Sequence, residues 1–180
     1  EQNGKYLEGT GSMVLDREHK ICYSAISIRT NRELVLKFCK DLGYVPVCFT
    51  ANQDVNGKRM AIYHTNVMMC IADKFAVICL DSIDDKNERK NVIHSLISTG
   101  KEIIEITQDQ KQIFAGNMLQ VMGDEVFLVM SSAAFSSLTQ TQKNAIKRYC
   151  SIIHTSLDTI ESCGGGSARC MMAEVFLPKN

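Results

Sequence analysis

Cys170 is the first candidate for chemistry in this chain, because it directly follows the segment Gly164-Gly-Gly-Ser-Ala-Arg169. A cysteine placed just after a glycine-rich turn can face exposed backbone N–H groups, and Arg169 adds a positive charge. Both features stabilise a thiolate and a developing anion. The same letters also fit a flexible loop that leads into a buried strand. A phosphate-binding loop is a weaker interpretation, because the Lys-Ser/Thr pair of a P-loop is absent.

A cysteine nucleophile needs a neighbouring acid and base, and His64 is the histidine that best suits this role. It lies in Tyr63-His-Thr-Asn-Val67, which its apolar flanks predict to be the middle of a strand. A strand histidine also suits a purely structural role, so the pairing with Cys170 is a hypothesis. The other histidines are interpreted as solvated residues of a predicted turn, His19, and of predicted helix faces, His94 and His154.

Glu8 is an acid set among glycines, in Leu7-Glu-Gly-Thr-Gly11. In such a setting a carboxylate can orient a histidine or bind a substrate cation. A plain turn explains the same letters, so this residue is a candidate by type and position only.

Charge and hydropathy exclude several classes of protein. The 180 residues carry 20 Lys plus Arg against 20 Asp plus Glu, so the basic surplus of a nucleic-acid or anionic-membrane binder is missing. No apolar run approaches the ~20 residues of a spanning helix. The opening Glu1-Gln2-Asn3-Gly4 does not resemble a signal peptide. We therefore expect neither nucleic acid nor membrane as a partner.

The eight cysteines do not form the pattern of a disulfide framework. Most lie inside apolar runs, where cysteine behaves as a small buried hydrophobe. There is no Cys-x-x-Cys pair and no histidine at finger-like spacing, so we expect no structural metal. A reducing, cytoplasmic location is the interpretation that follows.

The elements that must position these residues recur along the chain. Apolar residues alternate between strand-like and helical periods, and the order strand-strand-helix-strand occurs twice at a spacing of roughly 50 to 55 residues. The predicted ranges are 11–15, 21–26, 31–42 and 45–50 in the first copy and 62–71, 75–80, 87–98 and 102–106 in the second. An altered third copy is predicted with helices at 110–116 and 140–154 and strands at 126–130, 157–161 and 170–177. Repeats of this size are typical of arrays and propellers, although a common α/β motif also recurs by chance.

Four segments together resemble the arginine deiminase and amidinotransferase superfamily. They are Leu7-Glu-Gly-Thr-Gly-Ser12, Ser27-Ile-Arg-Thr-Asn31, Tyr63-His-Thr-Asn-Val67 and Gly164-Gly-Gly-Ser-Ala-Arg-Cys-Met-Met172. Within it they look most like the branch of citrulline utilization hydrolases, and dimethylarginine dimethylaminohydrolase is a more distant relative. The resemblance implies an α/β propeller of the pentein type, with five strand-strand-helix-strand units. About three of these fall in this chain, so residues 1–180 are expected to form part of a catalytic domain.

The resemblance also implies roles for single residues. Cys170 matches the nucleophile, His64 the general acid and base, and Glu8 the acid beside the reacting carbon. Arg29 matches the arginine that binds the α-carboxylate of the substrate, for which a planar guanidinium is well suited. Arg169 joins the predicted substrate-binding residues because of its place beside the nucleophile.

Two departures from the family pattern bear on function. Many relatives carry an acid two residues after the catalytic histidine, where this chain has Asn66. An amide suits a neutral ureido group better than a guanidinium. Relatives are also longer upstream, where they supply a further substrate-binding aspartate, so we expect an upstream part or a second polypeptide to complete the propeller.

The leading hypothesis is a cofactor-free, cysteine-dependent hydrolase that converts citrulline to ornithine. A deiminase or amidinotransferase acting on an arginine derivative is the second. A non-catalytic propeller fragment that serves as a binding module is the third. The expected ligand is a small guanidino or ureido amino acid, and homo-oligomerisation is left open.

Overall fold

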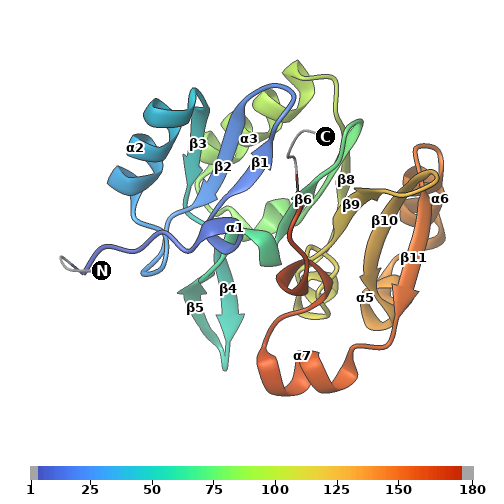
Figure 1. Cartoon of the computed structure of the whole chain (residues 1–180). Coiled ribbons are helices and arrows are strands. Elements are labelled where there is room, and N and C mark those ends of the chain that lie inside the picture. The colour runs from blue at the N-terminus through green and yellow to red at the C-terminus, as the bar shows by residue number, and fades with distance from the viewer. Residues whose placement is uncertain (1–3, 176–180) are drawn as a thin grey trace.

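Three small sheets with the same strand order dominate the computed structural model, which describes residues 4–175 (Figure 1). In each sheet the first two strands are antiparallel, and a helical crossover then returns the chain to a third strand parallel to the second. The fold is therefore mixed α/β. We call the three segments that build these sheets units one, two and three.

Unit one follows the sequence prediction closely from its second strand onward. Asn31 caps the crossover helix by accepting hydrogen bonds from the backbone of Glu33 and Leu34, and Gly43 ends it in the left-handed conformation at φ 70°. The predicted first strand is partly wrong, because a helical turn precedes a shorter strand. The elements are α1 (Gly9–Ser12), β1 (Val14–Asp16), β2 (Ile21–Ala25), α2 (Arg32–Leu42) and β3 (Val45–Phe49).

Unit two differs from the prediction at its start. The predicted strand 62–71 is reduced to its last residues, and His64 lies ahead of a short 3-10 helix rather than in a strand. The reason is tertiary: the Thr65 hydroxyl donates to Ser12 O and accepts from Ala25 N, which holds this segment against unit one. The elements are η1 (Thr65–Val67), β6 (Met69–Ile71), β7 (Phe75–Ile78), η2 (Leu80–Ser82), α3 (Lys86–Ser98) and β8 (Glu102–Glu105).

Unit three is more regular than the sequence indicated. The predicted helix 140–154 ends at Lys147, and the β-branched run after it becomes a strand, so His154 lies on a strand and stacks on Phe135. A first strand that was not predicted completes the sheet. The elements are α4 (Gln108–Gln112), β9 (Leu119–Met122), β10 (Val126–Ser131), α5 (Ser132–Ser137), α6 (Gln140–Lys147) and β11 (Ser151–Thr155).

The chain after unit three contradicts both predicted strands there. The segment predicted as strand 157–161 belongs to helix α7 (Asp158–Gly164), and Cys170 lies in the 3-10 helix η3 (Ala168–Met171). The end of the predicted strand 170–177 lies outside the described residues. A glycine-rich loop thus connects two helical turns, and both are set by local hydrogen bonds rather than by a sheet.

A hairpin that was not predicted leaves the body between units one and two, formed by β4 (Asn52–Val55) and β5 (Lys58–Ala61). Its turn is Asn56-Gly57, and both residues have positive φ. Asn-Gly is the strongest short sequence signal for such a turn. In Figure 1 the hairpin and α7 project from the same side of the molecule.

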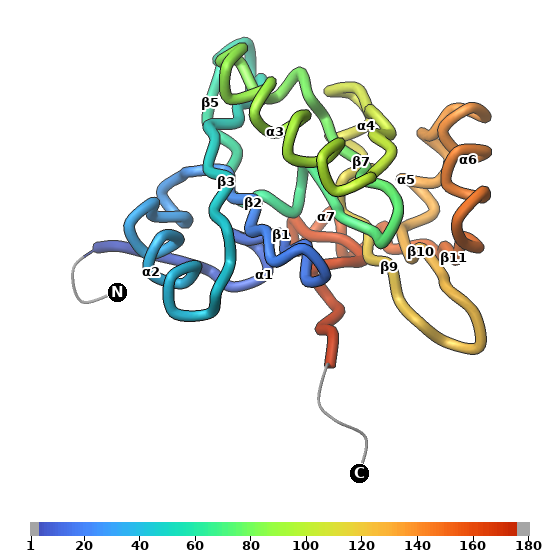
Figure 2. Tube along the Cα trace, turned by 90° about the horizontal axis from the view of Figure 1, so that it is seen from above, coloured from blue at the N-terminus to red at the C-terminus, as the bar shows by residue number. Residues whose placement is uncertain are grey.

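The units stand in an arc with helices α2, α3 and α6 outside and strands β1 and β9 near the middle (Figure 2). One apolar core joins units one and two around Tyr23, Phe49 and Met68, and another joins units two and three around Phe75 and Met118. The last described residues of the chain run along the open side of the arc. Among residues 4–175 no helix has the length and apolar character needed to cross a membrane.

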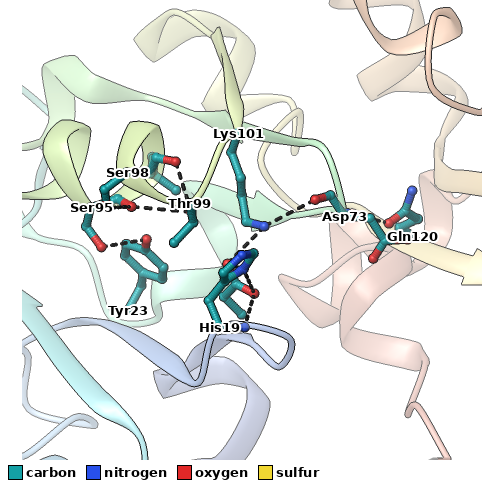
Figure 3. Close-up of polar contacts among 10 residues, drawn as sticks. His19, Tyr23, Asp73, Ser95, Ser98, Thr99, Lys101 and Gln120 are labelled. Atoms are coloured by element: carbon teal, nitrogen blue, oxygen red, sulfur yellow. Dashed lines mark hydrogen bonds and ion pairs between the residues drawn. The ribbon is translucent and has the colours of Figure 1, made fainter.

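A buried ion pair connects the end of β1 in unit one to the residue that precedes β8 in unit two. Lys101 Nζ lies 2.9 Å from Asp16 Oδ2, and both side chains are almost fully enclosed. Lys101 also donates to Asp73 O, and Asp73 N donates to Gln120 Oε1 in unit three (Figure 3). Burial alone would raise the pKa of Asp16, but hydrogen bonds from Lys101 and from His19 lower it below its ordinary value. Because the network crosses both unit boundaries, it fixes the units relative to one another.

Candidate active site

Glu8 and His64 form the closest charged contact of the candidate site, with 2.6 Å between Glu8 Oε2 and His64 Nε2. Each residue directly precedes the helical turn that opens its unit, α1 for Glu8 and η1 for His64. Ser12 holds the first turn in place, because its hydroxyl accepts from Glu8 N and donates to Arg29 O. A carboxylate at this distance fixes the orientation of the imidazole.

Gly11 provides the space for the imidazole ring. A Cβ atom on Gly11 would lie 2.9 Å from three ring atoms of His64, which is closer than real side chains approach. The short α1 turn therefore brings backbone, not side chain, against the catalytic candidate.

Arg29 lies on the other side of Glu8. Its Nη1 is 3.6 Å from Glu8 Oε2, and its guanidinium lies 5.4 Å from the centre of the Tyr63 ring. About half of the side chain is exposed. A guanidinium that is accessible and anchored by a carboxylate and an aromatic ring can bind a further anion.

Cys170 is exposed, and its sulfur faces two asparagine side chains. Asn117 Nδ2 donates to Cys170 Sγ at 3.3 Å, and Asn66 Nδ2 points to the same atom at 3.9 Å. On its other side the sulfur would lie only 3.2 Å from a Cβ atom on Gly166. The glycine-rich loop therefore lets the backbone pass close to the sulfur.

Tyr63 connects the two halves of the site. Its hydroxyl donates to Gly165 O at 3.0 Å, and its ring centre is 5.0 Å from that of His64. Burial raises the pKa of Tyr63, negative charge on Cys170 raises it further, and Arg29 lowers it. The tyrosine is therefore close to both the cysteine and the arginine.

Asn66 and Arg169, two of the residues predicted to bind substrate, are both buried. Asn66 is almost fully buried, with its Oδ1 atom unpaired. Arg169 is also buried: its guanidinium donates to Met118 O, and its positive charge lowers the pKa of the Cys70 thiol, which burial raises to about 11. Its guanidinium thus packs inside this part of the protein, and substrate binding by Arg169 stays a prediction.

The sequence alone did not reveal Asn117 or the hydrogen bond from the Tyr63 hydroxyl to Gly165 O. A signal for Asn117 was present: Gly116-Asn-Met-Leu119 precedes the first strand of unit three as Gly11-Ser-Met-Val14 precedes that of unit one. Aligning unit three with unit one on these two segments would have identified Asn117 as a candidate.

The arrangement supplies a thiol, an imidazole bound to a carboxylate, and an accessible guanidinium. These groups suit nucleophilic attack with proton transfer on a carboxylate-bearing substrate. Within residues 4–175 no group of histidine, cysteine, aspartate or glutamate has the clustering of a metal site.

Comparison with solved structures shows which known folds this chain resembles. The arginine dihydrolase ArgZ of cyanobacteria matches with a TM-score of 0.73 at 18% identity, over 96% of this chain and 25% of that one. The N-terminal domain of ArgZ, covalently bound to a reaction intermediate, matches with a TM-score of 0.70 at 18% identity, over 92% and 55%. An agmatine deiminase of C. jejuni matches with a TM-score of 0.56 at 11% identity, over 92% and 55%. The chain thus spans a quarter to about half of these relatives.

The family match and the fold together place the chain in the pentein superfamily of guanidino-modifying proteins, as the resemblance implied. Within it, the chain belongs to the family described as N,N dimethylarginine dimethylhydrolase, eukaryotic, whose model matches residues 1–177. No curated protein matches the chain by sequence.

Proposed function

We propose that this chain carries the catalytic groups of a cysteine-dependent hydrolase of C–N bonds in guanidino or ureido amino acids. The observation that carries the proposal is the 2.6 Å contact between Glu8 and His64 in a site that also presents an exposed Cys170. Its family and the solved structures it matches support the class, since their names describe hydrolases and deiminases.

The reaction proceeds in two steps. The Cys170 thiolate attacks the central carbon of the substrate, and His64 donates a proton to the departing amine as the C–N bond breaks. His64 then accepts a proton from water, which attacks the S-linked carbon, and the thiolate leaves. Glu8 holds the imidazole and balances its positive charge. Arg29 binds the α-carboxylate through its free N–H groups.

Citrulline is the substrate that Asn66 favours. A guanidinium next to an amide lacks the charge-assisted hydrogen bond that a carboxylate provides, whereas a neutral ureido group needs no such partner. The products are then ornithine, carbon dioxide and ammonia. A methylated or unmodified arginine is the second candidate, favoured by the name of the matching family.

In this proposal the complete fold is a five-unit propeller. Three of the units lie in this chain, and further polypeptide supplies the others and completes the site. A cavity of about 580 Å³ opens between the first strands of the units, with apolar walls that include Val121, Val126 and the highly exposed Val175. A second apolar hollow shares Leu15 with it and extends over unit one. In this proposal a segment of that further polypeptide covers this side, where Met122 and Val175 are exposed.

We propose a reducing, cytoplasmic setting for the protein. All eight cysteines are free thiols, and six of them lie in or beside the apolar cores. Burial raises the pKa of Cys22 to about 12 and that of Cys150 to about 11, so these thiols are poor nucleophiles.

The test uses the intact protein with citrulline, arginine and dimethylarginine as separate substrates. Wild type should release ornithine from citrulline, and Cys170→Ser should release none. Acid quenching followed by peptide mass analysis should find a carbamoyl or amidino adduct on Cys170. Product formation by Cys170→Ser at the wild-type rate, or an adduct on another residue, would refute the assignment. Turnover of an arginine derivative without turnover of citrulline would select the second candidate.

A further inference from the structure

Asn117 is a fully buried polar residue that neither the family resemblance nor the proposed reaction uses. It lies in the turn between α4 and β9, directly before unit three enters its sheet. The preceding Gly116 presses this turn against unit two, since a Cβ atom there would lie 2.6 Å from Val67 O. The position of Asn117 is therefore fixed by backbone packing and not only by its own hydrogen bonds.

The carboxamide of Asn117 contacts three groups around the nucleophile. Its Nδ2 donates to Asn66 O at 3.0 Å and to Cys170 Sγ at 3.3 Å, and its Oδ1 accepts from Arg169 N at 3.1 Å. The sulfur is 3.6 Å from Oδ1, which makes the amide nitrogen the nearer partner. Both N–H groups and the carbonyl of the side chain are thus occupied.

These partners also decide which way the amide is turned. The backbone N–H of Arg169 can only donate, and Asn66 O can only accept. The carboxamide oxygen must therefore face Arg169 and the NH2 group must face Asn66 O and the sulfur. In a flipped amide the NH2 group would face the N–H donor of Arg169, and the carboxamide oxygen would face the carbonyl oxygen of Asn66.

We propose that Asn117 is a positioning residue that presents Cys170 and stabilises its thiolate through an N–H donor at the sulfur. An N–H group stabilises a thiolate more than a thiol, and the effect is large where water is excluded from the donor. The bond to Arg169 N fixes the backbone next to the nucleophile, so the side chain controls both the place and the charge of the sulfur. The catalytic importance of this inference rests on the proposed function, but the experiment that tests it does not.

The test measures alkylation of Cys170 by iodoacetamide across a range of pH in the intact protein. Trypsin cleaves after Arg169, so Cys170 begins its own peptide, separate from that of Cys163. Asn117→Asp keeps the acceptor for Arg169 N but replaces the donor with a negative charge, and Asn117→Ala removes both. Asn117→Ser restores a hydroxyl donor. Asn144→Asp makes the same chemical change on the exposed face of α6, where Asn144 accepts from Gln140, and is the matched control.

We expect Asn117→Asp and Asn117→Ala to slow alkylation at neutral pH about tenfold or more and to move the half-maximal rate to higher pH, since a tenfold change corresponds to one pH unit. Asn117→Ser should recover part of the rate, and Asn144→Asp should match wild type. Folded Asn117→Asp and Asn117→Ala variants with the wild-type profile would overturn the inference. If neither variant folds, Asn117→Ser and Asn117→Val decide the question: the serine variant should be alkylated faster than the valine variant, and wild-type alkylation in Asn117→Val would overturn the inference. Alkylation needs no substrate, so an absence of turnover by the wild-type protein would refute the proposed function and leave this inference standing.

Discussion

Gly11→Ala should strongly lower the proposed activity while leaving the fold intact. Gly11 lies in the short α1 turn and has no positive φ, so alanine can adopt its backbone conformation. The new Cβ atom would lie 2.9 Å from the ring of His64, and an ordinary contact begins at 3.4 Å. The ring must therefore retreat by about half an ångström, and it cannot keep its hydrogen bond to Glu8 at the same time.

The magnitude follows from the role of the ring. A misplacement of about 1 Å costs about 10²-fold, and general acid–base catalysis contributes about 10² to 10⁴-fold, so we expect kcat/KM to fall by about 10² to 10³-fold. The assay is steady-state turnover of the preferred substrate together with thermal unfolding of each variant.

Gly164→Ala is the matched control for this substitution. A Cβ atom on Gly164 meets nothing within 4 Å, although this glycine borders the loop that leads to Cys170. The control should keep wild-type activity. A folded Gly11→Ala variant with kcat/KM within about threefold of wild type would show that His64 does not work in the orientation described, since such a change is under 1 kcal/mol.

Three further predictions concern charge and space. Asp16→Asn should lower the free energy of unfolding at pH 7 by about 3–5 kcal/mol, because it leaves Lys101 buried and unpaired. Because the pKa of Asp16 is lowered in the folded state, its carboxylate stabilises the fold above pH 3.8, and this contribution is lost as the pH falls through the folded pKa. Urea unfolding from pH 7 to pH 2 should therefore show a fall in the free energy of unfolding of wild type that the variant lacks. Asn66→Asp should shift the kcat/KM ratio from citrulline toward arginine by about tenfold, and an unchanged ratio would mean that Asn66 does not sense substrate charge. Gly166→Ala should slow alkylation of Cys170 by about tenfold, less than a full loss, because its Cβ contact of 3.1 Å needs only a small shift; wild-type kinetics would contradict the close approach.

The sequence predicted elements best where local chemistry alone determines them. The helix of unit one has its own cap at Asn31 and its own stop at Gly43, and it formed as expected. The segment around His64 did not, because hydrogen bonds from Thr65 to unit one override an apolar pattern that favours a strand. The Asn56-Gly57 turn was a local signal that the prediction did not use.

Site residues show the same division. Glu8 and His64 could be paired from residue type and resemblance, and the structure brings them into contact. The burial of Arg169 could not be predicted, because proximity to the nucleophile in sequence says nothing about the direction of a side chain. Asn117 lies 53 residues from Cys170, and only the packing of one unit on another reveals their contact.

The placement of Glu8, His64 and Asn117 ahead of the first strands of their respective units has a consequence for how the site could have arisen. Successive copies of one ancestral unit would each contribute the connection ahead of their first strand to a common centre, and changes at different positions within that connection would assign a different task to each copy. A chain divided between units two and three would then give two inert halves, because His64 would lie on one half and Asn117 and Cys170 on the other. Their mixture would regain the site only when the halves reassociate along the cores that join neighbouring units.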